Sequence, residues 1–362
     1  MAVSAKEQST YCNIMEGRPC RAACFDWDFR NVAITAPAER EGIFNERQRF
    51  VKMIKNLNFT IYPSEKEVKV TRNLPKRNFI KELKKFKNLC VSEPCGCILL
   101  SISSHGVIVK MNDQIDSGDF ETYEDFILTH PEPDENEFSE NYVDERISVK
   151  EIIDVFTDKG LRNIPKIFLI QACRNRFHAA NQDSDVDIGF DVCVVRDNGE
   201  GVPLPLNDLR VPPDPPGTNI AYSPPYLENS VIVFSTPFAP PKSKTNIFLD
   251  RSRKGVMNIH VFTMNIYMAE IGIEPGKDPC NNSYSTGAMS NFGSHVWCVL
   301  QETLKSMVPV NGSINLLDWL KKTNGDLAKD EKFEIKDNLK YKPLLSISHT
   351  LTKQILLKLQ RD

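Results

Sequence analysis

The chain has 362 residues, of which 41% are hydrophobic and 26% charged, which is ordinary for a globular protein and enough for one large buried core. Its formal net charge of -3 gives no reason to expect nucleic acid or an anionic membrane as a partner. No stretch approaches the roughly 18 consecutive apolar residues of a membrane-spanning helix, and residues 1–8 lack the apolar core of a secretory signal.

Short apolar runs alternate with helical patterns along the chain, which predicts an α/β fold with a mostly parallel sheet. The third and fourth runs are continuously apolar, as buried parallel strands are. The predicted strands are residues 21–27, 59–62, 96–103, 166–172, 230–235 and 344–348.

Apolar residues at helical spacing predict helices between these strands. One covers residues 50–57, and another follows Pro75 and covers residues 79–86. The basic side chains of residues 76–87 are read as the solvated face of this second helix rather than as a binding patch. Ser148 and Glu151 form a capping box. Two later helices follow Ser294 and Ser313, the latter with a predicted stop at Gly325.

Three polar segments interrupt this pattern. Residues 113–146 are rich in acidic side chains and are expected to form a charged surface loop. Residues 181–225 are rich in Asp, Pro and Gly and are expected to form a linker. Residues 238–284 form an insertion with a short helix expected at 259–271. The insertions are either partner surfaces or merely tolerated loops.

The ten cysteines are too few for a disulfide scaffold in a chain of this length. Several of them lie in apolar runs, so we expect reduced, mostly buried thiols in the cytoplasm, one or few of which carry chemistry. The Cys95-Gly-Cys97 spacing is too tight for a usual zinc clip, and no second pair completes one. We expect neither a metal nor a cofactor.

Chemistry-bearing residues stand where the two strongest predicted strands end. One strand ends in Ser104-His105-Gly106, and the other in Gln171-Ala172-Cys173-Arg174. Because loops converge at the carboxyl ends of parallel strands, His105 and Cys173 are expected to lie side by side. An imidazole beside a thiol activates it as a nucleophile, and the backbone N–H groups of Gly106 and Cys173 are candidates for an oxyanion hole.

A single Cys or His at a strand end is usually structural, but the neighbours of this pair favour catalysis. Here the sequence resembles the caspase family: Gln171-Ala-Cys-Arg is similar to the family's nucleophile motif, and Ser104-His105-Gly106 to its histidine motif. The resemblance extends from about residue 18 to 357, through the segments 40–42, 50–59, 230–236, 293–297 and 314–322.

The resemblance implies a caspase-like fold, a mostly parallel six-stranded sheet with helices on both faces. It implies a cytoplasmic cysteine endopeptidase that acts on protein substrates in apoptosis-like or other regulated proteolysis. Arg40 and Gln171 would bind the substrate's P1 aspartate, and the backbone carbonyl of Ala38 would orient His105.

The resemblance also implies a zymogen with a short propeptide (1–17), a large-subunit-like region (18–180), an intersubunit linker (181–225) and a small-subunit-like region (226–362). Cleavage is expected in the linker at Asp183, Asp185 or Asp187. The mature protein would be a homodimer or a heterodimer with another caspase.

Two positions depart from the family pattern. Asn175 stands where the family has Gly, a mild change because Asn tolerates positive φ. Ala288 stands near a position where the family has an Arg that completes the P1 pocket, and Lys244, Arg251 or Arg253 would have to replace it. These departures keep a second hypothesis open, a catalytically weak homologue that binds and modulates an active caspase.

Overall fold

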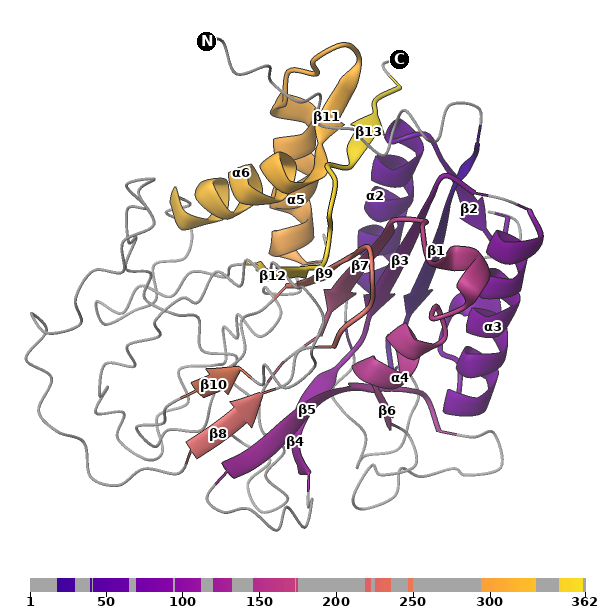
Figure 1. Cartoon of the computed structure of the whole chain (residues 1–362), viewed down its shortest axis with the longest axis vertical. Helices are drawn as coiled ribbons and strands as arrows, with labels where there is room; N and C mark the ends of the chain where they lie inside the picture. The colour runs from indigo at the N-terminus through magenta and orange to yellow at the C-terminus, as the bar shows by residue number, and fades with distance from the viewer. Residues whose placement is uncertain are drawn as a thin grey trace, which may run out of the picture.

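The computed structural model describes residues 18–29, 40, 42–64, 70–93, 95–111, 120–131, 146–172, 174, 219–222, 225–235, 247–249, 294–329 and 345–360. A six-stranded sheet lies at the centre, in the order β12-β9-β7-β3-β1-β2 (Figure 1). All its neighbouring strands pair in parallel except β12 and β9. The strands are β1 (Cys20–Asp26), β2 (Phe59–Tyr62), β3 (Cys97–Ser103), β7 (Lys166–Gln171), β9 (Ser230–Phe234) and β12 (Ser346–His349). The predicted fold class is confirmed.

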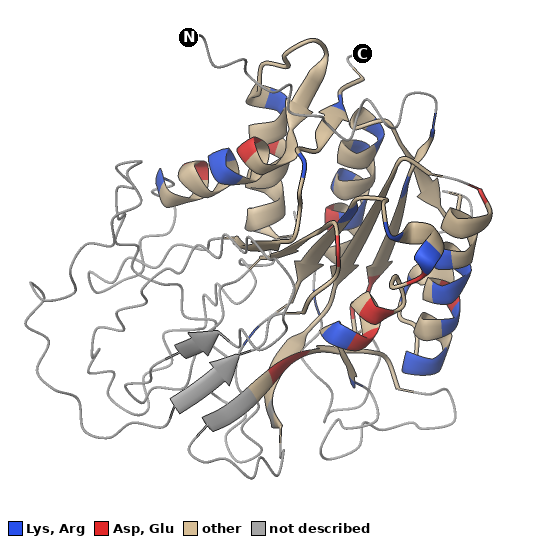
Figure 2. Cartoon of the chain, in the orientation of Figure 1, with Lys and Arg blue, Asp and Glu red and all other residues tan. Residues whose placement is uncertain are grey.

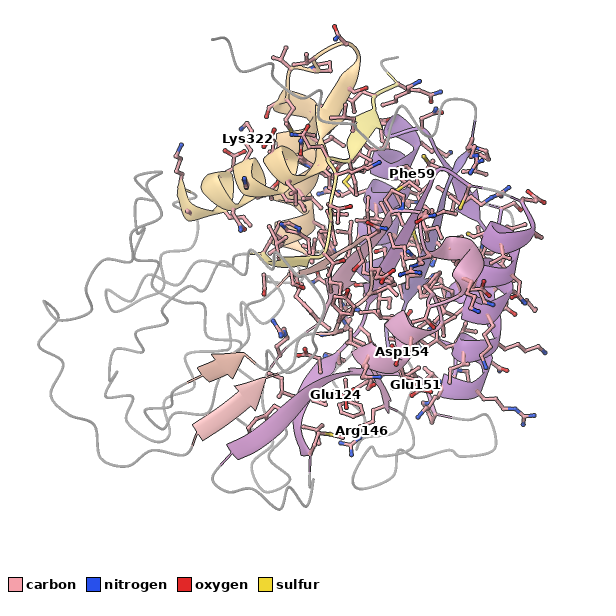
Figure 3. All side chains as sticks on the ribbon, viewed as in Figure 1. Phe59, Glu124, Arg146, Glu151, Asp154 and Lys322 are labelled. Carbon is pink, nitrogen blue, oxygen red and sulfur yellow. The ribbon has the colours of Figure 1, made fainter. Side chains whose placement is uncertain are left out.

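Alternating side chains of the sheet separate two hydrophobic cores, because successive residues of a strand point to opposite faces. In β1, Ala22 and Cys24 enter one core, while Ala23 and Phe25 enter the other. The first core is covered by α2 (Ile43–Asn56), α5 (His295–Ser306) and α6 (Leu316–Lys329), and the second by α3 (Lys76–Ser92) and α4 (Val149–Asp154). Figure 3 shows side chains filling both spaces, with Phe59 in the first.

The helix on the second face that follows β2 has one apolar and one basic face. Phe79, Leu83 and Phe86 of α3 are fully buried, while the side chains of Arg77 and Lys81 are exposed. Figure 2 shows several Lys and Arg positions, in blue, along the ribbon of α3. The interpretation of residues 76–87 as a solvated helix face is confirmed.

One half of the capping box at the start of α4 is confirmed, because Ser148 Oγ accepts a hydrogen bond from the backbone N–H of Glu151 at 3.0 Å. The short 3-10 helix η2 (Lys159–Leu161) then leads into β7.

A smaller sheet flanks the central one in the order β10-β8-β5-β4, with β6 also paired to β5. Its strands are β4 (Gly106–Met111), β5 (Phe120–Leu128), β6 (Arg146–Ser148), β8 (Asn219–Tyr222) and β10 (Ile247–Leu249). The acidic segment 113–146 is therefore not simply a loop. Residues 120–128 form a strand because Tyr123, Asp125 and Ile127 alternate inward despite the acidic composition.

Two details near the C-terminus differ from the prediction. Residues Ser313–Asn315 form β11, which pairs with β13 (Leu356–Lys358), so Ser313 does not cap a helix. Asn315 caps α6 instead, accepting from the backbone N–H of Leu317 at 2.9 Å. The helix also runs through Gly325 to Lys329, because its apolar face continues to the fully buried Leu327. The helix expected at 259–271 lies outside the described residues.

Among the helices that the structure describes, none is both long and apolar enough to cross a membrane.

Candidate active site

The candidate site is built on the carboxyl ends of β1, β3 and β7, which lie side by side. The backbone N–H of Trp27 donates to the carbonyl of Ser103 at 3.0 Å, and that of Ser104 donates to the carbonyl of Gln171 at 3.0 Å. Ser103 and Gln171 are also register partners in the sheet. The two motifs that the sequence placed at strand ends therefore begin from neighbouring strands.

His105 lies at the turn between β3 and β4, where it is partly exposed. Its carbonyl accepts from the backbone N–H of Leu128 at 2.9 Å, and Gly106 pairs with Ile127 in the smaller sheet. The hairpin of β4 and β5 thus fixes the backbone that carries the imidazole, and it leaves the ring at the sheet's edge.

Phe29 packs against this imidazole, with ring centroids 5.1 Å apart. Its backbone φ is 55°, which is uncommon for a bulky residue and costs free energy. On the other side Phe29 stacks on His130 at 6.4 Å, and burial is the main reason that the pKa of His130 lies below its ordinary value. Phe29 therefore limits the orientations open to His105.

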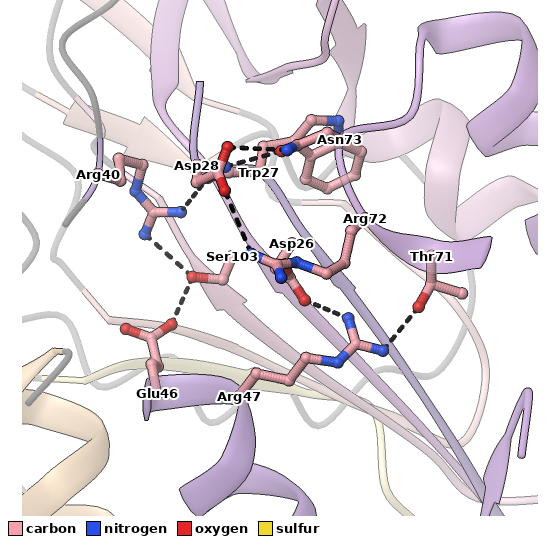
Figure 4. A network of polar contacts seen from close by, with 10 residues as sticks. All are labelled: Asp26, Trp27, Asp28, Arg40, Glu46, Arg47, Thr71, Arg72, Asn73 and Ser103. Carbon is pink, nitrogen blue, oxygen red and sulfur yellow. Dashed lines mark hydrogen bonds and ion pairs between the residues drawn. The ribbon is translucent and has the colours of Figure 1, made fainter. Parts of the chain in front are cut away.

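Asp28, directly before Phe29, is held by Asn73. Asn73 Oδ1 accepts from the Asp28 backbone N–H at 2.9 Å, and Asn73 Nδ2 donates to Asp28 Oδ1 at 2.8 Å (Figure 4). Arg72 adds a contact to Asp28 Oδ2 at 3.2 Å. These hydrogen bonds hold the backbone of Asp28 in place directly before Phe29, whose φ is positive.

Arg40, the expected P1 ligand, is buried at 3% exposure. Its guanidinium donates to the carbonyl of Trp27 and to Ser103 Oγ, each at 3.0 Å. Ser103 Oγ in turn donates to Glu46 Oε1 at 2.5 Å (Figure 4). Arg40 is thus already engaged by protein groups at the end of β3.

Glu46 is a buried carboxylate that the sequence did not single out. Its Oε2 accepts from the backbone N–H of Ser294 at 2.9 Å. Burial raises the pKa of Glu46, while the charge of Arg40, the Ser103 hydroxyl and the Ser294 N–H oppose that rise. In the sequence, Glu46 looks like any residue of an ordinary helix, so only the folded chain reveals that it lies beside Arg40.

A second buried cluster lies next to this network. Asp26, at the end of β1, contacts Arg47 of α2 and accepts from Arg72 Nε at 2.8 Å. Arg47 also donates to Thr71 Oγ1 at 2.7 Å. The end of β1 is thereby tied both to α2 and to the segment before α3.

The residues on either side of Cys173 are fixed in the core. Ala172 is buried, and Arg174 makes a two-pronged contact with Asp125 of β5 at 2.9 and 3.1 Å. The Arg174 guanidinium also lies over the ring of Phe234, 4.1 Å from its centroid. Gln171 is fully buried at the end of β7.

Several expected site residues lie outside the described part of the chain. They are Cys173, Asp183, Asp185 and Asp187, together with Ala38, Asn175, Lys244, Arg251, Arg253 and Ala288. Within the described ranges, no group of three or more His, Cys, Asp or Glu side chains is arranged to hold a metal ion.

One of the comparisons with known proteins identifies a family. The family model of the caspase domain matches residues 27–355. Among solved structures, caspase-1 from Spodoptera frugiperda is similar, with a TM-score of 0.53 and 15% identity over 99% of each chain. At that identity the likeness concerns the fold alone. No curated protein sequence matches the chain.

The buried pair of Asp125 and Arg174 yields a stability prediction. Asp125→Asn should lower the free energy of unfolding by about 3–5 kcal/mol, because it removes the carboxylate that faces a buried guanidinium. Urea denaturation measures the change. Glu228→Gln is the matched control, since its partner Arg162 is exposed and the loss should be far smaller. Equal losses in the two variants would contradict the prediction.

Proposed function

The chain belongs to the caspase family of cysteine proteases, and from that premise we propose that it is an endopeptidase that cleaves protein substrates after aspartate. Cys173 is the nucleophile and His105 the base. The observation that carries the proposal is the pairing of β3 with β7, whose carboxyl ends lead directly into His105 and into residue 173.

In the proposed reaction, the Cys173 thiolate attacks the carbonyl carbon of the scissile bond. The backbone N–H groups of Gly106 and Cys173 would stabilise the oxyanion that develops. His105 would pass the proton taken from the thiol to the leaving amine, and water would then hydrolyse the thioester. The partly exposed ring of His105 and its contact with Phe29 support this role, because a base must be both reachable and oriented.

Cys173→Ala and His105→Ala test the dyad. Each should lower kcat/KM for a peptide with P1 aspartate by about 10⁴-fold or more, because each removes one half of a unit that acts together. Hydrolysis of a fluorogenic peptide measures the loss, and circular dichroism checks that each variant is folded. Turnover retained by folded Cys173→Ala would refute the assignment.

Arg40 and Gln171 are proposed to bind the P1 side chain. A guanidinium binds a carboxylate with two parallel hydrogen bonds. Arg40 lies at the end of β3, because its guanidinium donates to Ser103, the residue directly before Ser104-His105. Its existing contacts hold it rigid, which favours selection by geometry.

For Arg40→Ala we expect a loss of about 10²–10³-fold in kcat/KM on a P1-aspartate peptide, since a buried charged contact is removed. The loss on the matched P1-asparagine peptide should be much smaller, because that side chain carries no charge. Kinetics on the two peptides give the comparison. Equal losses would mean that Arg40 supports the fold through Trp27 and Ser103 instead.

We also propose that the chain matures by cleavage between its large-subunit-like region (18–180) and small-subunit-like region (226–362), in the cytoplasm, where it acts in apoptosis-like or other regulated proteolysis. Its partner in a dimer would be a second copy or another caspase. The acidic residues of the interval, Asp183, Asp185 and Asp187, suit an aspartate-directed protease as cleavage sites.

Intact-mass spectrometry tests this maturation. Wild-type protein should yield fragments that end at Asp183, Asp185 or Asp187, whereas Cys173→Ala should stay whole because it lacks the nucleophile. A wild-type chain that is fully active and uncut would contradict the proposal.

The second hypothesis, a homologue that modulates an active caspase, is favoured by one specific observation. Arg40 is linked through Ser103 to the buried carboxylate of Glu46. In the sequence, Ala288 stands near the position of the family's second cation. Labelling with an electrophilic peptide that carries P1 aspartate separates the two functions. An enzyme is labelled at Cys173, and a purely modulating homologue is not.

A further inference from the structure

The buried side chain of Glu46 lies where two distant parts of the chain meet beside the candidate active site. Glu46 belongs to the first turn of α2 and is 4% exposed. Gly42, whose φ is 76°, turns the chain into α2 two residues after Arg40, and its carbonyl accepts from the backbone N–H of Glu46 at 3.0 Å. A φ of this sign costs glycine little. The turn brings the Glu46 carboxylate within hydrogen-bond distance of Ser103 at the end of β3.

Both oxygens of the Glu46 carboxylate are engaged. Oε1 accepts from the hydroxyl of Ser103 at 2.5 Å (Figure 4), and Oε2 accepts from the backbone N–H of Ser294 at 2.9 Å. A carboxylate held at both oxygens keeps one orientation. Its two donors come from β3 and from the start of α5, so Glu46 connects these elements at the edge of the sheet that carries His105.

The hydroxyl of Ser103 takes its direction from Glu46. A serine hydroxyl has one proton to donate and two lone pairs with which to accept. Because the proton of Ser103 goes to Glu46, a lone pair is directed to Arg40, whose Nη2 donates to Ser103 Oγ at 3.0 Å. Without an acceptor at position 46, the hydroxyl would be free to turn its proton elsewhere. Glu46 therefore secures the contact between Ser103 and Arg40.

Arg40 is fixed by three hydrogen bonds to the protein. Its backbone N–H donates to the carbonyl of Asp28 at 2.9 Å, and its Nη1 donates to the carbonyl of Trp27 at 3.0 Å. The third bond is the one from Nη2 to Ser103. The two side-chain bonds together fix the plane of the guanidinium, and two-pronged binding of a carboxylate depends on that plane.

We propose that Glu46 is a positioning residue for recognition of the P1 aspartate. Through Ser103 it sets the orientation in which Arg40 meets the carboxylate of the substrate, an inference that rests on the proposed role of Arg40. Glu46 acts through these two side chains and not by contact with the substrate. Through Ser294 the same carboxylate ties that orientation to α5, so both sides of the proposed cleavage interval support one pocket.

Glu82 supplies a matched control. It is also a buried glutamate of a helix, 8% exposed, and both of its oxygens are engaged, one by the hydroxyl of Tyr62 at 3.2 Å and one by Lys85 at 2.6 Å. These contacts lie on α3 and β2. A change from Glu to Gln removes a charge and an acceptor oxygen at either position, but only position 46 is linked to Arg40.

Kinetics on two matched peptides, one with P1 aspartate and one with P1 asparagine, test the inference. Glu46→Gln should lower kcat/KM on the aspartate peptide by about 10-fold, mainly through KM, because one amide oxygen cannot accept from both Ser103 and Ser294. On the asparagine peptide the change should stay within about 2-fold, because no charged partner is recognised. Glu82→Gln should leave both peptides at the wild-type rate.

Variants of Ser103 distinguish positioning from support of the fold. Ser103→Ala breaks the link to Arg40 but keeps the bond between Glu46 and Ser294, and it should cause the same selective loss. The double variant with Glu46→Gln should lose no more than Ser103→Ala alone, because both changes act through the same hydrogen bonds. Ser103→Thr keeps the hydroxyl and should keep the preference for aspartate. Circular dichroism checks that each variant is folded.

Binding to Cys173→Ala separates this inference from the proposed endopeptidase, because binding needs no turnover. Fluorescence anisotropy with a peptide that ends in aspartate amide should show about 10-fold weaker binding when Glu46→Gln or Ser103→Ala is added. An asparagine amide peptide should show no such change. This result beside a wild-type chain that cleaves no peptide would refute the enzyme and retain the role of Glu46.

Three results would overturn the inference and leave the endopeptidase standing. The first is an unchanged preference for aspartate in both Glu46→Gln and Ser103→Ala. The second is an equal loss on the aspartate and asparagine peptides. The third is a Cys173→Ala protein that binds the aspartate amide peptide no better than the asparagine one.

Discussion

The buried charges at the carboxyl end of β1 are the constraint on which the rest of the carboxyl edge of the central sheet depends. A carboxylate such as Asp26 is stable away from water only when cations and hydrogen-bond donors surround it. Arg47 from α2 and Arg72 from the segment before α3 meet that need. Because both cations come from elements that follow β1, compensating one strand-end charge fixes the approach of α2 and α3 to the sheet.

Glu46 extends the same logic to the C-terminal part of the chain. Its carboxylate connects to Arg40 through Ser103 and to the backbone N–H of Ser294, 248 residues further along. Ser294 is the N-cap of α5, and its side chain makes no capping hydrogen bond, so the carboxyl group of Glu46 anchors the start of that helix. A carboxylate near a helix N-terminus is electrostatically favourable. The two regions that a linker cleavage would separate are therefore held together by a buried polar bond as well as by their shared core.

The sequence was sufficient for the sheet, because buried parallel strands such as 97–103 and 166–171 are continuously apolar and need no tertiary information to be recognised. The sequence was insufficient where the same type of residue can be either solvated or buried. Asp125 looks like part of a solvated acidic loop, yet in β5 it holds the buried Arg174. Phe29 looks like an ordinary aromatic residue in the sequence. Neither its positive φ nor its contact with His105 can be predicted from the neighbouring residues.

The charge balance around Arg40 bears on which P1 residue the site can select. Arg40 already donates to the carbonyl of Trp27 and to Ser103 Oγ, and Ser103 Oγ donates in turn to Glu46. An incoming aspartate would share this guanidinium with those acceptors, so its carboxylate would gain less from Arg40 than from an isolated guanidinium. Strong preference for aspartate therefore needs a further cation from elsewhere in the chain, for which Lys244, Arg251 and Arg253 are the candidates.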